Sequence, residues 1–184
     1  MLSALVRWFN HQDVTYAIIG GVAVGLVSQP RATQDIDAVA WLDLDDAALF
    51  LDSGQAFGFD ARIPDPIGFA RQNRVLLLHH SESHIGVDLS LGVLPLEREM
   101  LDRALELDIG GTRLRVATPE DLIILKAIAH RKRDFIDIDS LLDVHPNLDV
   151  GRMRNWIRQF ADALESPEIL SDFESLLENR SGKS

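Results

Sequence analysis

The spacing of hydrophobic and polar residues divides the chain into a mixed first part and a helical second part. Apolar side chains at Leu2, Leu5, Val6 and Phe9 predict an amphipathic helix over residues 2–12. Apolar runs at 14–20 and 35–42 predict strands, and a short helix is expected between them at 22–29. Residues 43–57 have helical spacing, with aspartates at the amino end, where the helix dipole favours them.

The next two apolar runs, at 73–80 and 84–92, predict strands joined as a hairpin by the polar turn 81–83. A helix is predicted from Pro95 to about Leu107, and a short strand at 112–117. Residues 118–145 then predict one long helix, because Thr118 suits the N-cap and Pro119 the first helical position. Two amphipathic helices, interrupted at 166–168, complete the pattern within 148–178.

These elements predict an α/β (α+β) fold, with a mixed β-sheet flanked by helices and followed by a small helical region packed on the core. The boundary is expected near Ala117, so that residues 1–117 form the α/β core and residues 118–184 the C-terminal helical region. A chain of 184 residues with 46% hydrophobic content is long enough to bury such a core.

Composition excludes several classes of protein. The chain has no cysteine, so disulfides, thiolate metal sites and a cysteine nucleophile are excluded. No apolar run approaches the roughly 18 residues that a membrane span needs, and the first residues lack the pattern of a signal peptide. A cytoplasmic protein without a membrane partner is therefore expected. The formal charge of −11 argues against broad, non-specific nucleic-acid binding, although a local basic groove stays open.

Two aspartates stand inside a predicted strand. Asp35 and Asp37 flank Ile36, and because side chains alternate along a strand, both carboxylates project from one face. Carboxylates that close repel each other, so a compensating cation is expected, and Mg²⁺ (or Mn²⁺) prefers such oxygen ligands. The alternative is an exposed strand end without a function.

Two further features favour a site. Asp88 interrupts a second apolar strand between Val87 and Leu89, so it could supply a third carboxylate from a neighbouring strand. Gly20 and Gly21 lie between a predicted strand and a helix, where glycine permits close approach of a ligand and the helix offers N–H groups to phosphate. Alone, a Gly-Gly pair usually marks a tight turn.

Lys126 interrupts a long apolar run, which is unusual for a surface lysine. If the predicted helix continues, one of its faces carries Lys126, His130, Arg133 or Asp134, and Asp137. The lysine and arginine could then bind a triphosphate, although an internal salt-bridge ladder would produce the same pattern. The roles of the two aspartates are left open. His79, His80 and His84 are interpreted as exposed hairpin residues rather than zinc ligands.

The segment 18–41 resembles the first motif of the DNA polymerase β-like nucleotidyltransferase superfamily: Gly-Gly, a short helix, then D-x-D on the next strand. Its stretch from Arg31 to Asp37, which includes Thr33, is most similar to the AbiEii-type branch, which includes toxins of type IV toxin–antitoxin systems. Residues 86–92 resemble the second motif and residues 117–142 the third. The resemblance spans residues 14–142, and the chain after it is shorter than in many AbiEii-type proteins.

The resemblance implies a nucleotidyltransferase that moves NMP from an NTP to a hydroxyl acceptor. Asp35 and Asp37 would bind two Mg²⁺ (or Mn²⁺) ions, and Asp88 would complete the second metal site and activate the acceptor hydroxyl. Gly20 and Gly21 would cradle the β- and γ-phosphates, with Lys126 assisting. The nucleotide-binding residues would also include Arg31, Thr33 and Arg133.

The acceptor stays open between a tRNA 3′ end, a small hydroxylated molecule such as a cationic antibiotic, and a protein hydroxyl. A toxin role with an antitoxin partner is implied by the resemblance alone. The alternative function is a non-catalytic nucleotide- and metal-binding module of regulatory or antitoxin-like type. The three carboxylates argue against that alternative, because a domain without catalysis has no physical reason to keep mutually repelling acids.

Overall fold

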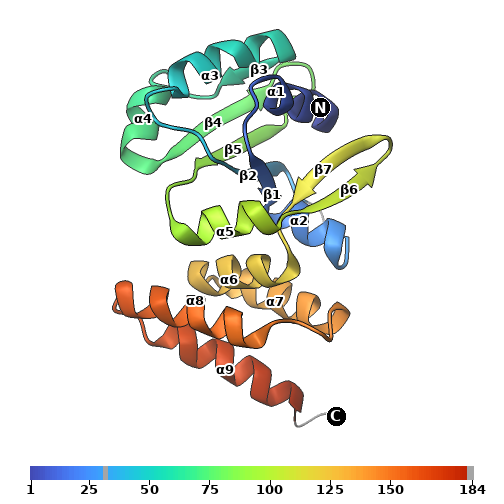
Figure 1. Ribbon diagram of the computed structural model, residues 1–184, viewed down its shortest axis with the longest axis vertical. Helices are drawn as coiled ribbons and strands as arrows, with labels where there is room; N and C mark the ends of the chain where they lie inside the picture. Colours follow the sequence, from blue (N-terminus) through green and yellow to red (C-terminus); the bar gives the residue numbers. More distant parts are fainter. Residues whose placement is uncertain (31–32, 182–184) are drawn as a thin grey trace. The chain divides into compact units, whose positions relative to one another are not determined.

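Seven strands within the described residues, 1–30 and 33–181, form one mixed sheet in this computed structural model (Figure 1). The order is β3-β4-β5-β2-β1-β7-β6; β2 pairs in parallel with β5 and β1 with β7, and the other neighbours are antiparallel. This arrangement confirms the predicted fold class. The strands are β1 (Tyr16–Ile19), β2 (Asp35–Ala40), β3 (Phe59–Ala61), β4 (Val75–His80), β5 (Gly86–Leu91), β6 (Leu105–Ile109) and β7 (Thr112–Val116).

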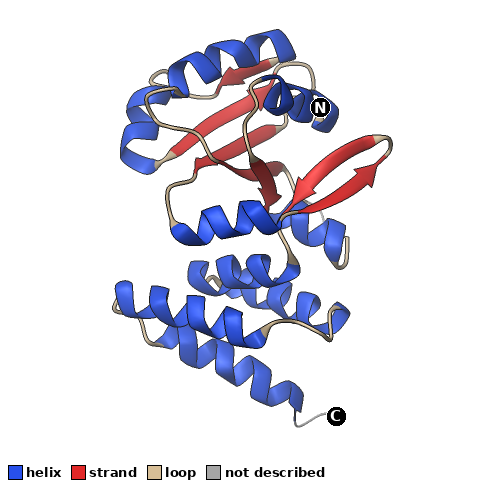
Figure 2. Cartoon of the chain, in the orientation of Figure 1, coloured by secondary structure: helices blue, strands red, loops and turns tan. Residues whose placement is uncertain are grey.

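The chain divides into two units, one comprising Met1–Gly25 and Arg31–Thr118, and the other Leu26–Pro30 and Pro119–Ser184. Figure 2 shows the strands in the first unit and a helical second unit. Within the described chain, no helix combines the length and apolar character needed to cross a membrane. The first part of the chain contains α1 (Leu2–His11), α2 (Gly20–Val27), α3 (Ala47–Gly54), the 3₁₀ turn η1 (Gln55–Phe57), α4 (Pro66–Asn73) and α5 (Pro95–Arg103).

The strands β3, β4, β5 and β2 have one covered face and one open face. Burial alternates along β4, where Leu76, Leu78 and His80 are buried while the residues between them are partly exposed, and along β5 from Val87 to Leu91. The covered face packs against aromatic side chains: the Trp8 ring lies 4.4 Å from the Phe50 ring and 5.3 Å from the Phe59 ring, centroid to centroid. The aspartates of β2 and β5 are therefore left on the open face, whereas His80 lies on the covered one.

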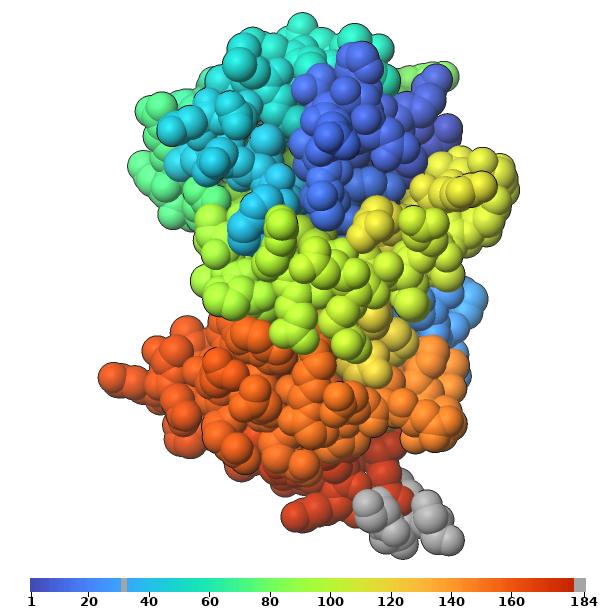
Figure 3. Space-filling view, viewed as in Figure 1, coloured from blue at the N-terminus to red at the C-terminus, as the bar shows by residue number. Residues whose placement is uncertain are grey.

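The second unit is built around α6 (Pro119–Ala129), which contacts α7 (Lys132–Val144), α8 (Val150–Ala163) and α9 (Glu168–Ser181). Its core is apolar, with Ile124, Leu141 and Ile157 fully buried. In Figure 3, α8 and α9 appear in orange to red on the surface of this unit. The segment Leu26–Pro30 is tied to α7 by Ser28, whose Oγ lies 2.7 Å from Ser140 Oγ.

Three details of the predicted secondary structure are wrong. The long helix over 118–145 is two helices, because the chain turns at His130, which adopts a φ of 51° between α6 and α7. The helix that begins at Pro95 ends at Arg103 instead of Leu107, because Leu105–Ile109 pairs with β7 as a strand. Strand β3 and helix α4 were not predicted. The hairpin between β4 and β5 is confirmed.

Candidate active site

Three carboxylates lie on the open face of the sheet at adjacent positions of two parallel strands. Asp37 of β2 is the register partner of Asp88 of β5, and Asp35 precedes Asp37 by two residues. Paired residues and residues two apart share a face, so the three side chains point the same way. The side chains of Asp35 and Asp88 are 50% and 39% exposed. We call Asp35, Asp37 and Asp88 the carboxylate cluster.

Gly20 brings the start of α2 directly against this cluster. β1 ends opposite Asp37, since Ile19 and Asp37 are register partners, and Gly20 follows with a φ of 65°. A Cβ atom at position 20 would lie 2.0 Å from Asp37 Oδ2. Glycine is therefore required here both for the left-handed backbone and for the space that the carboxylate fills. Gly21 is buried in the first turn of α2.

In the connection before β2, the side chain of Thr33 contacts the backbone of the strand. Thr33 donates a hydrogen bond from Oγ1 to the backbone carbonyl of Asp35 at 3.1 Å, which steadies the start of the strand. Its side chain thus acts on the backbone that carries the cluster. Arg31, which was predicted to bind the nucleotide, lies outside the described residues, and its role stays a prediction.

Arg62 reaches the carboxylate cluster from the sheet edge, and sequence reasoning missed it. Its backbone N–H donates to the Leu77 carbonyl at 2.8 Å, which extends the β3–β4 ladder by one residue. Its guanidinium donates from Nη2 to Asp88 Oδ1, and Nη1 lies 3.8 Å from Asp35 Oδ1. A guanidinium therefore partly neutralises two of the three carboxylates. The alternation in the short segment around β3 is too brief to reveal this residue from sequence.

Gly86 provides the space in which Arg62 and Asp35 approach each other. A Cβ atom at position 86 would lie 2.3 Å from Asp35 Oδ1 and 2.6 Å from Arg62 Nη1. The register agrees, because Gly86 is paired with Asp35 on one side and with His79 on the other. A side chain at this position would separate the guanidinium from the carboxylate.

The hairpin histidines occupy different environments, so their prediction as three exposed residues is wrong. His80 is 7% exposed on the covered face, where its ring lies 5.1 Å from Phe59. His79 is partly buried on the open face, between Gly86 and Asp60, and its Nδ1 atom is buried without a hydrogen-bond partner among the described residues. Only His84 of the three is exposed.

Lys126 belongs to the second unit, where it forms a buried ion cluster with two aspartates. Its Nζ lies 2.8 Å from Asp134 Oδ1 and 2.7 Å from Asp137 Oδ2. The predicted face of one continuous helix is wrong, because α6 and α7 are separate; the packing of α7 on α6 brings the three residues together. Arg133 is exposed on α7. The predicted triphosphate contacts of Lys126 and Arg133 stay predictions.

The chemistry of the carboxylate cluster suits a hard divalent cation, but its present arrangement does not. Carboxylate oxygens are the ligands that Mg²⁺ and Mn²⁺ prefer. Among residues 1–30 and 33–181, however, no group of three or more histidine, aspartate or glutamate side chains is gathered closely enough to hold a metal ion. Two of the three carboxylates instead face Arg62, which donates to Asp88 and lies near Asp35.

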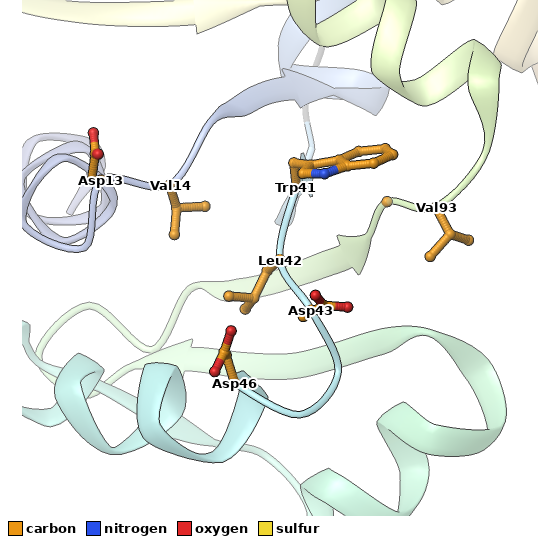
Figure 4. A pocket seen from close by; sticks show the side chains of 8 residues that line it. Asp13, Val14, Trp41, Leu42, Asp43, Asp46 and Val93 are labelled. Carbon is orange, nitrogen blue, oxygen red and sulfur yellow. The ribbon is translucent and has the colours of Figure 1, made fainter.

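A separate acidic pocket of about 490 Å³ lies at the other end of β2 (Figure 4). Its lining residues are Asp13, Val14, Trp41, Leu42, Asp43, Asp46, Gly92 and Val93. Trp41 follows Asp37, the nearer aspartate of β2, by four residues of extended chain, at about 3.3 Å per residue, which is about 13 Å. An acceptor hydroxyl in this pocket would be too far from the carboxylate cluster for direct transfer, so the pocket is not part of the candidate site.

The fold and the strand–Gly-Gly–helix connection beside paired carboxylates define a nucleotidyltransferase-type α/β protein. Its fold is similar to that of an antigenic nucleotidyltransferase-like protein from Paracoccidioides brasiliensis, with a TM-score of 0.58, 18% identity, and coverage of 92% of this chain and 89% of that one. It is also similar to the lincosamide antibiotic adenylyltransferase LnuA, solved with lincomycin bound, with a TM-score of 0.53, 15% identity, and coverage of 78% and 96%.

The chain belongs to the family DUF6036, described as nucleotidyltransferases of unknown function, whose model matches residues 3–174. The predicted superfamily is thereby confirmed, whereas the AbiEii-type branch is not. No curated protein matches the chain.

Proposed function

We propose that this protein transfers a nucleoside monophosphate from an NTP to a hydroxyl acceptor. The observation that carries the proposal is the carboxylate cluster on the open face of two parallel strands, with the Gly20 backbone packed against Asp37. Family membership supports the same class of reaction. We also propose that the protein works in the cytoplasm, where both NTPs and the candidate acceptors are available.

The residues would share the work as follows. Backbone N–H groups at Gly20 and Gly21, at the start of α2, bind the β- and γ-phosphates, aided by the positive end of the helix dipole. Asp35, Asp37 and Asp88 would hold Mg²⁺ or Mn²⁺, and the metal would supply positive charge to neutralise the phosphates.

Asp88 then accepts the proton of the acceptor hydroxyl. The hydroxyl oxygen bonds to the α-phosphorus, the bond to the bridging oxygen breaks, and pyrophosphate leaves. Catalysis rests mainly on positioning and on charge neutralisation. In this scheme Lys126, Arg133, Arg31 and Thr33 assist in holding the nucleotide.

A tRNA 3′ end and a small hydroxylated molecule are the first acceptors to test, with a protein hydroxyl as the third. The net charge of −11 disfavours a large polyanion and favours a small cation. LnuA, which shares the fold, was solved with lincomycin, and this also motivates the small-molecule arm. A toxin role with a protein antitoxin is proposed only if tRNA proves to be the acceptor.

The test is transfer of label from α-labelled NTPs, with Mg²⁺ or Mn²⁺, to total tRNA, to a pool of aminoglycosides and lincosamides, or to protein. We expect label on one acceptor class and a loss on the order of 10²-fold or more in Asp37→Asn, the size usual for removing one preorganised charged group. Asp52→Asn is the matched control, because Asp52 is exposed on α3. Equal transfer by Asp37→Asn and wild type would refute the mechanism. Metal-dependent nucleotide binding without transfer to any acceptor would favour the binding module instead.

A further inference from the structure

Arg62 is a cationic partner of the carboxylate cluster rather than an ordinary surface arginine. It starts from the edge strand β3 and crosses β4 to reach β5 and β2. The backbone bond to Leu77 fixes where the side chain begins, and the absence of a side chain at Gly86 clears the space for its guanidinium. Two independent features of the sheet therefore direct this guanidinium to Asp35 and Asp88.

The charges explain what such a contact does. The three carboxylates share one face, so their negative charges repel one another unless a cation lies among them. The Arg62 side chain is 31% exposed, and those of Asp35 and Asp88 are 50% and 39% exposed. Ion pairs this open to water are weak and readily exchanged. The guanidinium can therefore hold the cluster together and still be displaced.

We propose that Arg62 is a displaceable counter-cation of the active site, an inference that rests on the proposed function. A divalent cation and the guanidinium compete for Oδ1 of Asp88 and for Asp35, so metal binding requires Arg62 to leave. The released guanidinium, with its rigid fork of donors, then binds a phosphate of the NTP bidentately. Arg62 thus makes binding of the metal alone unfavourable and binding of metal with nucleotide favourable.

The two halves of this exchange predict opposite effects of one substitution. In Arg62→Gln, Mn²⁺ without nucleotide should bind about fivefold to tenfold more tightly, because a competing and repelling positive charge is removed. Non-hydrolysable α,β-methylene NTP analogues, at saturating Mn²⁺, should bind about tenfold more weakly, because a charged hydrogen bond is lost. A residue that merely stabilised the fold would change both affinities in the same direction.

The experiment uses the full chain and measures free Mn²⁺ by electron paramagnetic resonance and analogue binding by calorimetry. Arg62→Lys keeps the charge and should leave the Mn²⁺ affinity within about twofold of wild type, while weakening the analogue, because lysine lacks the bidentate fork. Arg71→Gln, an exposed arginine of α4, is the matched control and should change neither affinity.

Unchanged or weaker Mn²⁺ binding by Arg62→Gln would overturn the inference, provided that wild type binds Mn²⁺ and Asp37→Asn does not. Under that result the proposed metal site would stand and only the exchange would fail. If neither wild type nor Arg62→Gln bound Mn²⁺, the metal site of the proposed function would fail together with the inference.

Discussion

The substitution Lys126→Met is expected to destabilise the helical unit, because Lys126 is the shared cation of two buried carboxylates. The side chains of Lys126, Asp134 and Asp137 are 12%, 2% and 5% exposed, and both ion pairs are shorter than 3 Å, at 2.8 and 2.7 Å. Methionine keeps nearly the same length and apolar stem, so packing is conserved. The loss is therefore electrostatic: two carboxylates stay buried without their common ammonium.

The magnitude follows from this burial. Removing one partner of a buried ion pair costs about 3–5 kcal/mol of the free energy of unfolding. For a chain of this size each kcal/mol lowers the melting temperature by about 2–4 °C, so a fall of about 6–20 °C is expected. A loss of this size is a large share of the stability of an ordinary domain, about 5–15 kcal/mol.

The assay is urea unfolding followed by circular dichroism and by tryptophan fluorescence, in which Trp156 of α8 belongs to the second unit and Trp8 and Trp41 to the first. Lys132→Met, at an exposed position of α7, controls for loss of a lysine. A triple variant that also carries Asp134→Asn and Asp137→Asn should recover part of the loss, because no uncompensated charge is left buried.

A Lys126→Met protein that unfolds like wild type but transfers no label would refute this reasoning. That result would show that the ion cluster does not hold the unit together, and it would leave nucleotide binding as the only proposed role of Lys126.

Two further predictions concern single residues. Gly20→Ala should lower label transfer at least tenfold, because a Cβ would lie 2.0 Å from Asp37 Oδ2. Gly111→Ala controls for the backbone strain of about 1–2 kcal/mol, because Gly111 is also at positive φ but has no heavy atom within 4 Å of an added Cβ. Equal activity of the two variants would contradict the prediction. A hydrogen bond from Arg154 lowers the pKa of Glu174, so their pairing stabilises the fold above the ordinary pKa of 4.5 and is lost as pH falls through the lowered value. Because these side chains are 37% and 33% exposed, Glu174→Gln should cost at most about 1 kcal/mol in urea unfolding at pH 7, and the cost should shrink steadily as the pH is lowered below 4.5. A cost that does not change with pH would exclude the linkage.

The sequence was sufficient to predict the strands that carry the carboxylates, because alternation over 35–42 and 84–92 is long enough to define two faces. It suggested that Asp88 could lie on a strand beside Asp37. The parallel pairing of β2 with β5, which sets these residues directly opposite, depends on the order of the whole sheet and is not contained in either segment. Local pattern predicted the faces, and tertiary pairing decided which residues meet.

The break between α6 and α7 shows a different limit. Apolar and charged residues continue at helical spacing through 118–145, and neither glycine nor proline interrupts them at the turn. The chain nevertheless turns at His130, whose φ is 51°. Histidine enters the left-handed region more readily than branched residues do, but too rarely for that preference to predict a helix end. Packing of Lys126 against Asp134 and Asp137 is a tertiary contact that a periodic pattern cannot report.

The position of Arg62 shows that mutual repulsion among the carboxylates is not sufficient evidence for a metal site. Repulsion requires a compensating cation, and from sequence a divalent metal ion is the natural candidate. In the folded chain a guanidinium 26 residues from Asp88 already supplies part of that compensation. Repulsion alone therefore does not establish a metal site, since Arg62 satisfies the same requirement. A competition experiment separates the two roles: a structural arginine would keep its contacts with Asp35 and Asp88 when Mn²⁺ is added, whereas a displaceable one would give them up.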